Sequence, residues 1–210
     1  MDYYEESDIE MEPLCERVLK RPGMYLGDIE NGDAYAVIVQ HAVDLALRWQ
    51  VGSDLQLDLL PDNEINLTCR AAPPGDTRQY AMDRFRPLVV ALDGSPAIRP
   101  AWFAPGPQIV SCVCRLVHIE MRYSSKLISA IFCEGECTRD SPDKSSLPKE
   151  LCLRIRMNIG TQRLPIVPAT LEQVVDRICH MDGPPEADYW GRIAVADVRM
   201  GATRNIVVTD

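Results

Sequence analysis

The chain has 210 residues, of which 46% are hydrophobic and 25% charged, and it carries a net charge of −9 at neutral pH. A chain of this length can bury a core without depending on disulfides or metal ions, so we predict one soluble domain. The acidic balance argues against a protein that coats nucleic acid, because phosphate binding depends on clustered lysine and arginine.

The composition of the N-terminal region indicates the cellular compartment of the protein. Residues 1–12 contain six acidic side chains and no basic one, unlike the basic start of a signal peptide. Since the chain also lacks an apolar run of about 18 residues, we expect a cytoplasmic protein that does not contact a membrane. We interpret 1–12 as an acidic arm and 13–210 as a single domain.

The eight cysteines are the next feature to interpret. In a cytosolic protein they are expected to stay reduced, as buried or half-buried thiols. Close cysteine spacing at 112–114 and 133–137 leaves a structural metal site as the alternative.

Apolar periodicity predicts the first elements in chain order. A short helix is expected at 12–20, ended by Pro22 and Gly23, and a longer helix follows with Asp33 as its N-cap and Gly52 as its stop. Alternating apolar residues then predict a hairpin with strands at 55–59 and 65–69, joined by a turn at 61–64.

The second half of the chain begins after an irregular, proline-containing stretch. The apolar segment 109–114 is compatible with helix or strand, and Thr170 with Gln173 forms a capping box that starts a helix. Further strands are expected at 116–123, 127–134, 151–157, 193–200 and 205–209. This order predicts an α+β fold, a mostly antiparallel sheet covered on one face by helices.

The most specific string in the chain, KRPGMYLGD, runs from Lys20 to Asp28. It resembles the RPGMYIGD segment near the start of the ATPase domain of DNA gyrase B and topoisomerase IV, which belong to the GHKL family. The matching signature residues are Arg21, Pro22, Gly23, Met24, Tyr25, Gly27 and Asp28. The later order of elements also resembles that family, and 108–116 resembles its helix-forming GVSVVNALS. The resemblance implies a two-layer α/β sandwich of the GHKL, or Bergerat, type.

The catalytic residues of the resembled family lie on its long helix. A glutamate there acts as general base on the attacking water, and an asparagine holds Mg²⁺. In this chain the base position falls at Val37 or Ile38, and the asparagine position at His41 or Ala42. A hydrocarbon cannot accept a proton, and neutral imidazole is a poor ligand for Mg²⁺. The resemblance therefore predicts a loss of hydrolysis and no catalytic or metal-binding residue.

The nucleotide-binding motifs of the family are missing as well. Its adenine-binding DDGRGIP corresponds to CRAAPP at 69–74, which has neither the aspartate nor the glycines. Its glycine-rich lid, GGLHGVG, corresponds to WFAPGP at 102–107, where one glycine between two prolines cannot cradle phosphates. We therefore expect no cofactor, and the length predicts no transducer or DNA-cleavage domain.

The loss of all three elements predicts a non-catalytic pseudo-ATPase domain that serves as a protein-binding or regulatory accessory module. Its partner would be a topoisomerase or a second copy of the chain, without direct contact to nucleic acid. Candidate interaction residues are Tyr3 and Tyr4 in the acidic arm, and Trp102 and Phe103 in the proline-rich loop.

Two alternatives remain open from the sequence. The first is a divergent ATP-binding protein or weak ATPase with Mg²⁺, in which Asp83 and Asp93 replace the lost groups. The second concerns Arg154 and Arg156, which share one face of the strand expected at 151–157. They form either a solvated face or a contact for an anion or an acidic partner.

Overall fold

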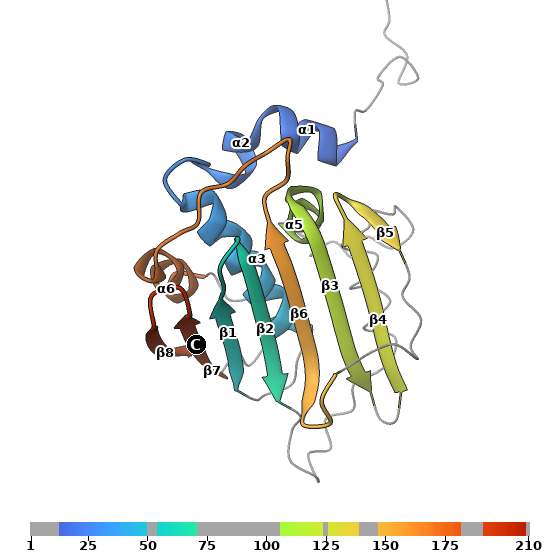
Figure 1. Ribbon diagram of the computed structural model, residues 1–210, viewed down its shortest axis with the longest axis vertical. Helices are drawn as coiled ribbons and strands as arrows, with labels where there is room; N and C mark the ends of the chain where they lie inside the picture. Colours follow the sequence, from blue (N-terminus) through green and yellow to red (C-terminus); the bar gives the residue numbers. More distant parts are fainter. Residues whose placement is uncertain are drawn as a thin grey trace, which may run out of the picture.

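The computed structural model describes residues 13–49, 54–70, 106–123, 126–138, 147–181 and 191–208. In these ranges one sheet is covered on one face by helices, with α3 running behind the strands in Figure 1. The helices are α1 (Leu14–Lys20), α2 (Pro22–Leu26), α3 (Asp33–Trp49), α5 (Gly106–Val113) and α6 (Leu171–Cys179). The strands are β1 (Leu55–Leu59), β2 (Glu64–Arg70), β3 (Cys114–Tyr123), β4 (Lys126–Cys133), β5 (Glu136–Thr138), β6 (Leu151–Ile159), β7 (Gly191–Asp197) and β8 (Ala202–Val208).

The sheet has eight strands in the order β5-β4-β3-β6-β2-β1-β7-β8. Among the described strands, β1 and β7 pair in parallel and every other neighbouring pair is antiparallel. The predicted α+β fold is therefore confirmed, and so is the turn of the first hairpin, where Asp62 and Asn63 both have a φ of +58°. The parallel pair joins distant parts of the chain and was not predicted.

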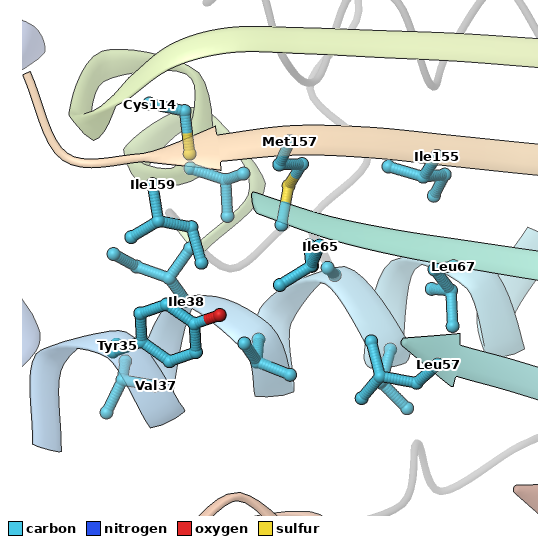
Figure 2. Packing of buried hydrophobic residues seen from close by; sticks show 14 of the residues in the cluster. Tyr35, Val37, Ile38, Leu57, Ile65, Leu67, Cys114, Ile155, Met157 and Ile159 are labelled. Carbon is cyan, nitrogen blue, oxygen red and sulfur yellow. The ribbon is translucent and has the colours of Figure 1, made fainter. Parts of the chain in front are cut away.

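The hydrophobic core lies between the sheet and its helices. Strands β1, β2 and β6 alternate, so that Leu57, Leu67 and Ile155 point toward α3 while their neighbours face away (Figure 2). Helix α3 contributes Tyr35 and Ile38, both 0% exposed, to the same core. This alternation explains why a simple pattern of period two predicted these strands correctly.

The helix boundaries differ from expectation near residue 22. Helix α1 ends at Lys20 as predicted, and the unpredicted helix α2 starts at Pro22, where the missing N–H of proline has no cost. Helix α3 begins at Asp33, whose N–H donates to Asn31 Oδ1 at 2.9 Å, so Asn31 rather than Asp33 supplies the cap. The predicted stop at Gly52 lies outside the described residues. Among the described helices, none has the length and apolar character needed to cross a membrane.

The segment at 109–114 resolves into helix α5 followed directly by β3. The short strand β5 was not predicted, because three residues are too few to show a period. The irregular, proline-containing stretch lies largely outside the described residues, since 71–105 and 139–146 are not among them.

The expectation that all cysteines stay reduced is wrong for one pair. Cys15 in α1 and Cys112 in α5 form a disulfide, with their Cα atoms 5.0 Å apart. Because Cys112 is bonded to Cys15, it is not available as a metal ligand beside Cys114. The two cysteines are separated by 97 residues, and only the packing of α1 against α5 brings them together.

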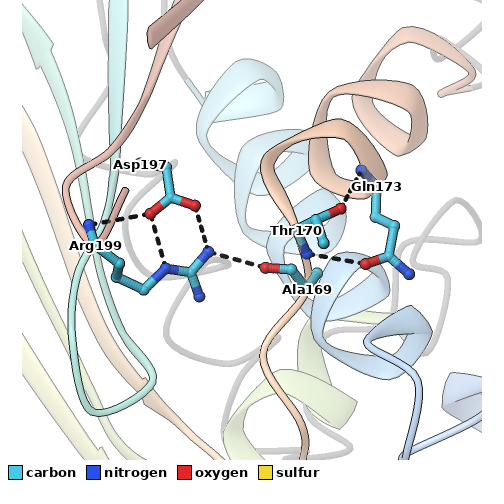
Figure 3. Close-up of polar contacts among 5 residues, drawn as sticks. All are labelled: Ala169, Thr170, Gln173, Asp197 and Arg199. Carbon is cyan, nitrogen blue, oxygen red and sulfur yellow. Dashed lines mark hydrogen bonds and ion pairs between the residues drawn. The ribbon is translucent and has the colours of Figure 1, made fainter. Parts of the chain in front are cut away.

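Helix α6 starts as predicted. Thr170 Oγ1 accepts from the Gln173 N–H, and Gln173 Oε1 accepts from the Thr170 N–H, which completes the capping box (Figure 3). The Gln173 side chain also donates to the Asn31 carbonyl at 2.9 Å. The cap of α6 therefore also holds the loop that leads into α3.

We expect Gly32→Ala to destabilise this junction. Gly32 has a φ of +95°, and an added Cβ would lie 2.9 Å from Ala169 Cα and 2.9 Å from Gln173 Oε1. The expected loss is about 1–3 kcal/mol in the free energy of unfolding, measured by urea denaturation. Gly23→Ala is the control, because nothing lies within 4 Å of its added Cβ. Equal stability of both variants would contradict this packing.

The turn between β7 and β8 is held by an internal ion pair (Figure 3). Arg199 Nε donates to Asp197 Oδ1 at 2.8 Å, and an Arg199 terminal nitrogen donates to Oδ2 at 2.7 Å. The guanidinium also donates to the Ala169 carbonyl at 2.9 Å and lies over the Tyr35 ring. A single arginine thus links the turn, the segment before α6 and helix α3.

This ion pair predicts a pH dependence of stability. The hydrogen bonds from Arg199 lower the pKa of Asp197, which is buried, below its ordinary value of about 3.9. The carboxylate therefore contributes stability above about pH 4, and this contribution is lost as pH falls through the lower folded-state pKa. We expect the stability gap between wild type and Asp197→Asn to be full at pH 6 and to shrink below about pH 4. Denaturation at several pH values measures it, and a gap that widens on acidification would contradict the assignment.

Candidate functional site

The signature segment at 21–28 forms a bend between helices. Arg21 lies between α1 and α2, with its N–H on the Arg17 carbonyl and its own carbonyl accepting from the Met24 N–H. Gly27 has φ +77° and ψ −150°, a conformation open only to glycine, and it ends α2. The Asp28 carbonyl then accepts from the Ala34 N–H at 3.0 Å.

The signature residues stabilise the bend between the helices. Asp28 Oδ1 accepts from the Glu30 N–H at 2.8 Å, and Tyr25 packs against the core. Pro22 begins α2, Gly23 has open space around it, and Met24 is 73% exposed. The segment 21–28 therefore positions α1 and α2 ahead of α3. The contacts described for these residues are structural.

The face of α3 at the expected catalytic positions is part of the core. Val37 is 8% exposed, Ile38 0% and Ala42 1%. Figure 2 shows Ile38 beside Ile159 of β6, whereas Val37 extends from the helix away from these strands. The remaining candidate, His41, is half-buried and has an interaction of its own. Val37 and Ile38, at the expected general-base position, offer neither a proton acceptor nor a polar surface for a water molecule.

The end of β2 is the start of the segment, 69–74, that corresponds in position to the family's adenine-binding motif. Cys69, at 0% exposure, occupies the first of its positions, and its Sγ lies 3.2 Å from Cys152 Sγ on β6. A thiol pair therefore stands at this strand end, instead of a carboxylate. The rest of the motif, 71–74, lies outside the described residues, as do Asp83 and Asp93.

The predicted interaction residues Tyr3, Tyr4, Trp102 and Phe103 also lie outside the described residues. Of the expected lid, the backbone of Gly106 and Pro107 is described, and these residues form the first turn of α5. At its other end α5 is tied to α1 by the disulfide of Cys112.

The sheet face opposite α3 carries a network of polar side chains that was not predicted. Glu120 on β3 is 0% exposed, and its Oε2 accepts from Arg154 Nε at 2.5 Å. Arg156 Nη2 lies 3.7 Å from the same oxygen and donates to His118 Nδ1 at 2.7 Å. Because a guanidinium can only donate, Nδ1 accepts, and Nε2 carries the proton toward Ser129 Oγ at 2.9 Å.

This network answers the question left open about the two arginines. Arg154 is only 14% exposed in its side chain, so a fully solvated face is wrong for it, whereas Arg156 is 47% exposed. Both arginines contact an acidic residue of the same chain, Glu120. The signal lies in the register, which sets Glu120 opposite Arg154 and His118 opposite Arg156, and this register cannot be read from one strand alone.

A hollow of about 650 Å³ lies on the same face, at the end of the sheet where β1 begins. Gln56, Thr68 and Asn205 line it together with charged residues of both signs, among them Arg192 and Glu150. The mixed charges favour neither a purely anionic nor a purely cationic ligand.

No family model matches the chain, and no curated protein matches it in sequence. Solved structures share its fold, among them two from DNA gyrase B. The B-subunit of the DNA gyrase from Myxococcus xanthus aligns with a TM-score of 0.61 and 18% identity, over 92% of this chain and 55% of that one. The 43K ATPase domain of Thermus thermophilus gyrase B, in complex with an aminocoumarin, aligns with a TM-score of 0.61 and 14% identity, over 91% and 50%.

These alignments bear on the fold alone, because the identities are low. The chain spans about half the length of the gyrase proteins it matches. The arrangement shared with them is a sheet covered by helices. The chain has the GHKL-type α+β sandwich fold of the gyrase B ATPase domain.

Proposed function

We propose that this chain is a non-catalytic, cytoplasmic, gyrase-B-like domain that binds a protein partner. The observation that carries the proposal is the apolar face of α3, where Val37, Ile38 and Ala42 are closed into the core. A general base must reach a water molecule, and a buried hydrocarbon cannot accept its proton. The retained fold would then act by binding a protein partner with its surface.

Two further observations support the loss of nucleotide chemistry. A buried thiol, that of Cys69, occupies the first position of the segment that corresponds to the family's adenine-binding motif. The first turn of α5 contains Pro107, which has no N–H to offer a phosphate at a helix N-terminus.

Titration calorimetry with ATP·Mg²⁺ and with a non-hydrolysable analogue tests this part of the proposal. We expect no binding heat up to about 1 mM nucleotide, equivalent to binding weaker than about −4 kcal/mol. A saturable signal in the micromolar range would overturn it and favour the alternative, a divergent ATP-binding protein. Release of phosphate above the buffer rate would identify a weak ATPase.

Protein binding is tested separately. The tagged chain, recovered from its native host under gentle conditions, is expected to bring down a gyrase or topoisomerase subunit, or to sediment as a dimer when pure. Recovery of the bait alone, together with a monomer in sedimentation, would contradict a binding module.

Two double variants would map the contact. Tyr3→Ala with Tyr4→Ala tests the acidic arm, and Trp102→Ala with Phe103→Ala tests the proline-rich loop. Each is expected to reduce partner recovery, because tyrosine, tryptophan and other aromatic side chains often dominate the binding energy of an interface. Val207→Ser is the control, since Val207 is a 64% exposed apolar residue on the edge strand β8. Unchanged recovery in both double variants would exclude these residues from the contact.

A further inference from the structure

The thiols of Cys69 and Cys152 lie closer together than their sequence separation of 83 residues suggests. Their Sγ atoms are 3.2 Å apart, across the pairing of β2 with β6. Cys152 Sγ also lies 3.4 Å from the Arg70 carbonyl, and Cys69 Sγ lies 3.1 Å from the same carbonyl. Both sulfur atoms thus gather at one point at the end of β2.

A β-bulge is the reason for this arrangement. The register pairs Cys69 with Leu153 and Arg70 with Leu151, so Cys152 is the extra residue of β6. In a regular antiparallel pair, Cys152 would point to the opposite face from Leu153 and Cys69. A bulge redirects the side chain of its extra residue, and here it turns Cys152 toward Cys69.

The two thiols differ in access and in acidity. Cys69 is buried, whereas Cys152 is partly exposed. The hydrogen bond between the thiols lowers the pKa of Cys152, against the opposing effect of its partial burial. The thiolate is the nucleophile in exchange with disulfides, so Cys152 is the thiol suited to react first.

We propose that Cys69 and Cys152 form a reactive dithiol, which a small-molecule disulfide oxidises reversibly to a cross-strand disulfide. The Cys152 thiolate attacks one sulfur of the small disulfide, breaks its S–S bond and releases one thiol. The Cys69 thiolate then attacks the Cys152 sulfur of the mixed disulfide and displaces the second thiol. The protein loses two electrons and two protons, and the small disulfide becomes two thiols.

The geometry requires little movement for this step. The sulfur atoms must approach from 3.2 Å to the bonded distance of about 2.05 Å. The other free cysteines of the described residues do not belong to this thiol pair. Cys114 is buried, which raises its pKa strongly, and Cys133 and Cys179 are exposed thiols outside this pair.

The experiment uses the full chain with glutathione disulfide as the probe. After alkylation of the remaining thiols, peptide mapping by mass spectrometry reports the state of each cysteine. In the wild type we expect a peptide linked through Cys69 and Cys152, which disappears when dithiothreitol is added. Cys179→Ser is the matched control and should leave this link unchanged.

Single variants separate the two steps. Cys69→Ser should keep glutathione on Cys152, because the second thiol is missing, and Cys152→Ser should leave Cys69 unmodified, because it is buried. Circular dichroism checks that each variant is folded, and Cys69→Ala replaces the serine variant if it is not. If glutathione accumulates on Cys133 and Cys179 while Cys69 and Cys152 stay free, the proposal is overturned. The wild-type map decides this even if both variants fail to fold.

Discussion

Replacing Cys112 with serine is expected to lower the free energy of unfolding by about 2–5 kcal/mol. The Cys15–Cys112 disulfide closes a loop of 97 residues, and long loops lose most entropy in the unfolded chain when they are closed. The bond also joins α1 to α5, two short helices that pack against each other. Urea unfolding of the wild type and of Cys112→Ser, without reductant, measures the difference.

The first control removes the Cys15–Cys112 disulfide by chemical reduction instead of by mutation. Dithiothreitol should destabilise the wild type by a similar amount and leave Cys112→Ser unchanged, because the variant has no such disulfide to lose. Cys179→Ser, at an exposed position, should match the wild type. If the reductant leaves wild-type stability unchanged, the disulfide does not contribute as described.

Replacing Glu120 with alanine is expected to cost about 3 kcal/mol, at the low end for breaking a buried ion pair. Glu120 is 0% exposed and is contacted by the guanidinium groups of Arg154 and Arg156. Its removal leaves Arg154, only 14% exposed in its side chain, without this carboxylate and unable to regain full hydration. The partial exposure that Arg154 keeps places the loss below the upper end of the range. Urea unfolding measures it.

A double-mutant cycle separates the pair from general packing. Glu120→Ala with Arg154→Ala should be more stable than the sum of the single losses predicts, because the second change removes the guanidinium that lost its contact with Glu120. Glu136→Ala, at an exposed position on β5, is the control and should change stability by less than about 0.5 kcal/mol. Strict additivity of the two single changes would show that the two side chains are not coupled.

Much of the fold was predictable because its signals are local. The capping box of α6 depends on Thr170 and Gln173, three residues apart, and the Asp62-Asn63 turn depends on two adjacent residues. The strands of the first hairpin followed from strict alternation of Leu55, Leu57 and Leu59 with polar neighbours. The resemblance to the GHKL family extended these local signals to the whole sandwich.

Little of the candidate site was predictable from the sequence. The resemblance implies that the family's general-base position falls at Val37 or Ile38, and the structure shows that both side chains are buried in the core. The thiol pair of Cys69 and Cys152 had no signal in the sequence, since it depends on a bulge that adds one residue to β6. The same holds for the contact of Glu120 with Arg154, which depends on the register between β3 and β6.

The sequence by itself determined the order and type of most helices and strands and the acidic charge. Only the tertiary structure decided which cysteines are bonded, which acid meets the two arginines and how β1 pairs in parallel with β7. The physical reason is distance along the chain. Periods and caps act within a few residues, whereas a disulfide, a cross-strand ion pair or a strand register forms only when the core brings remote segments together.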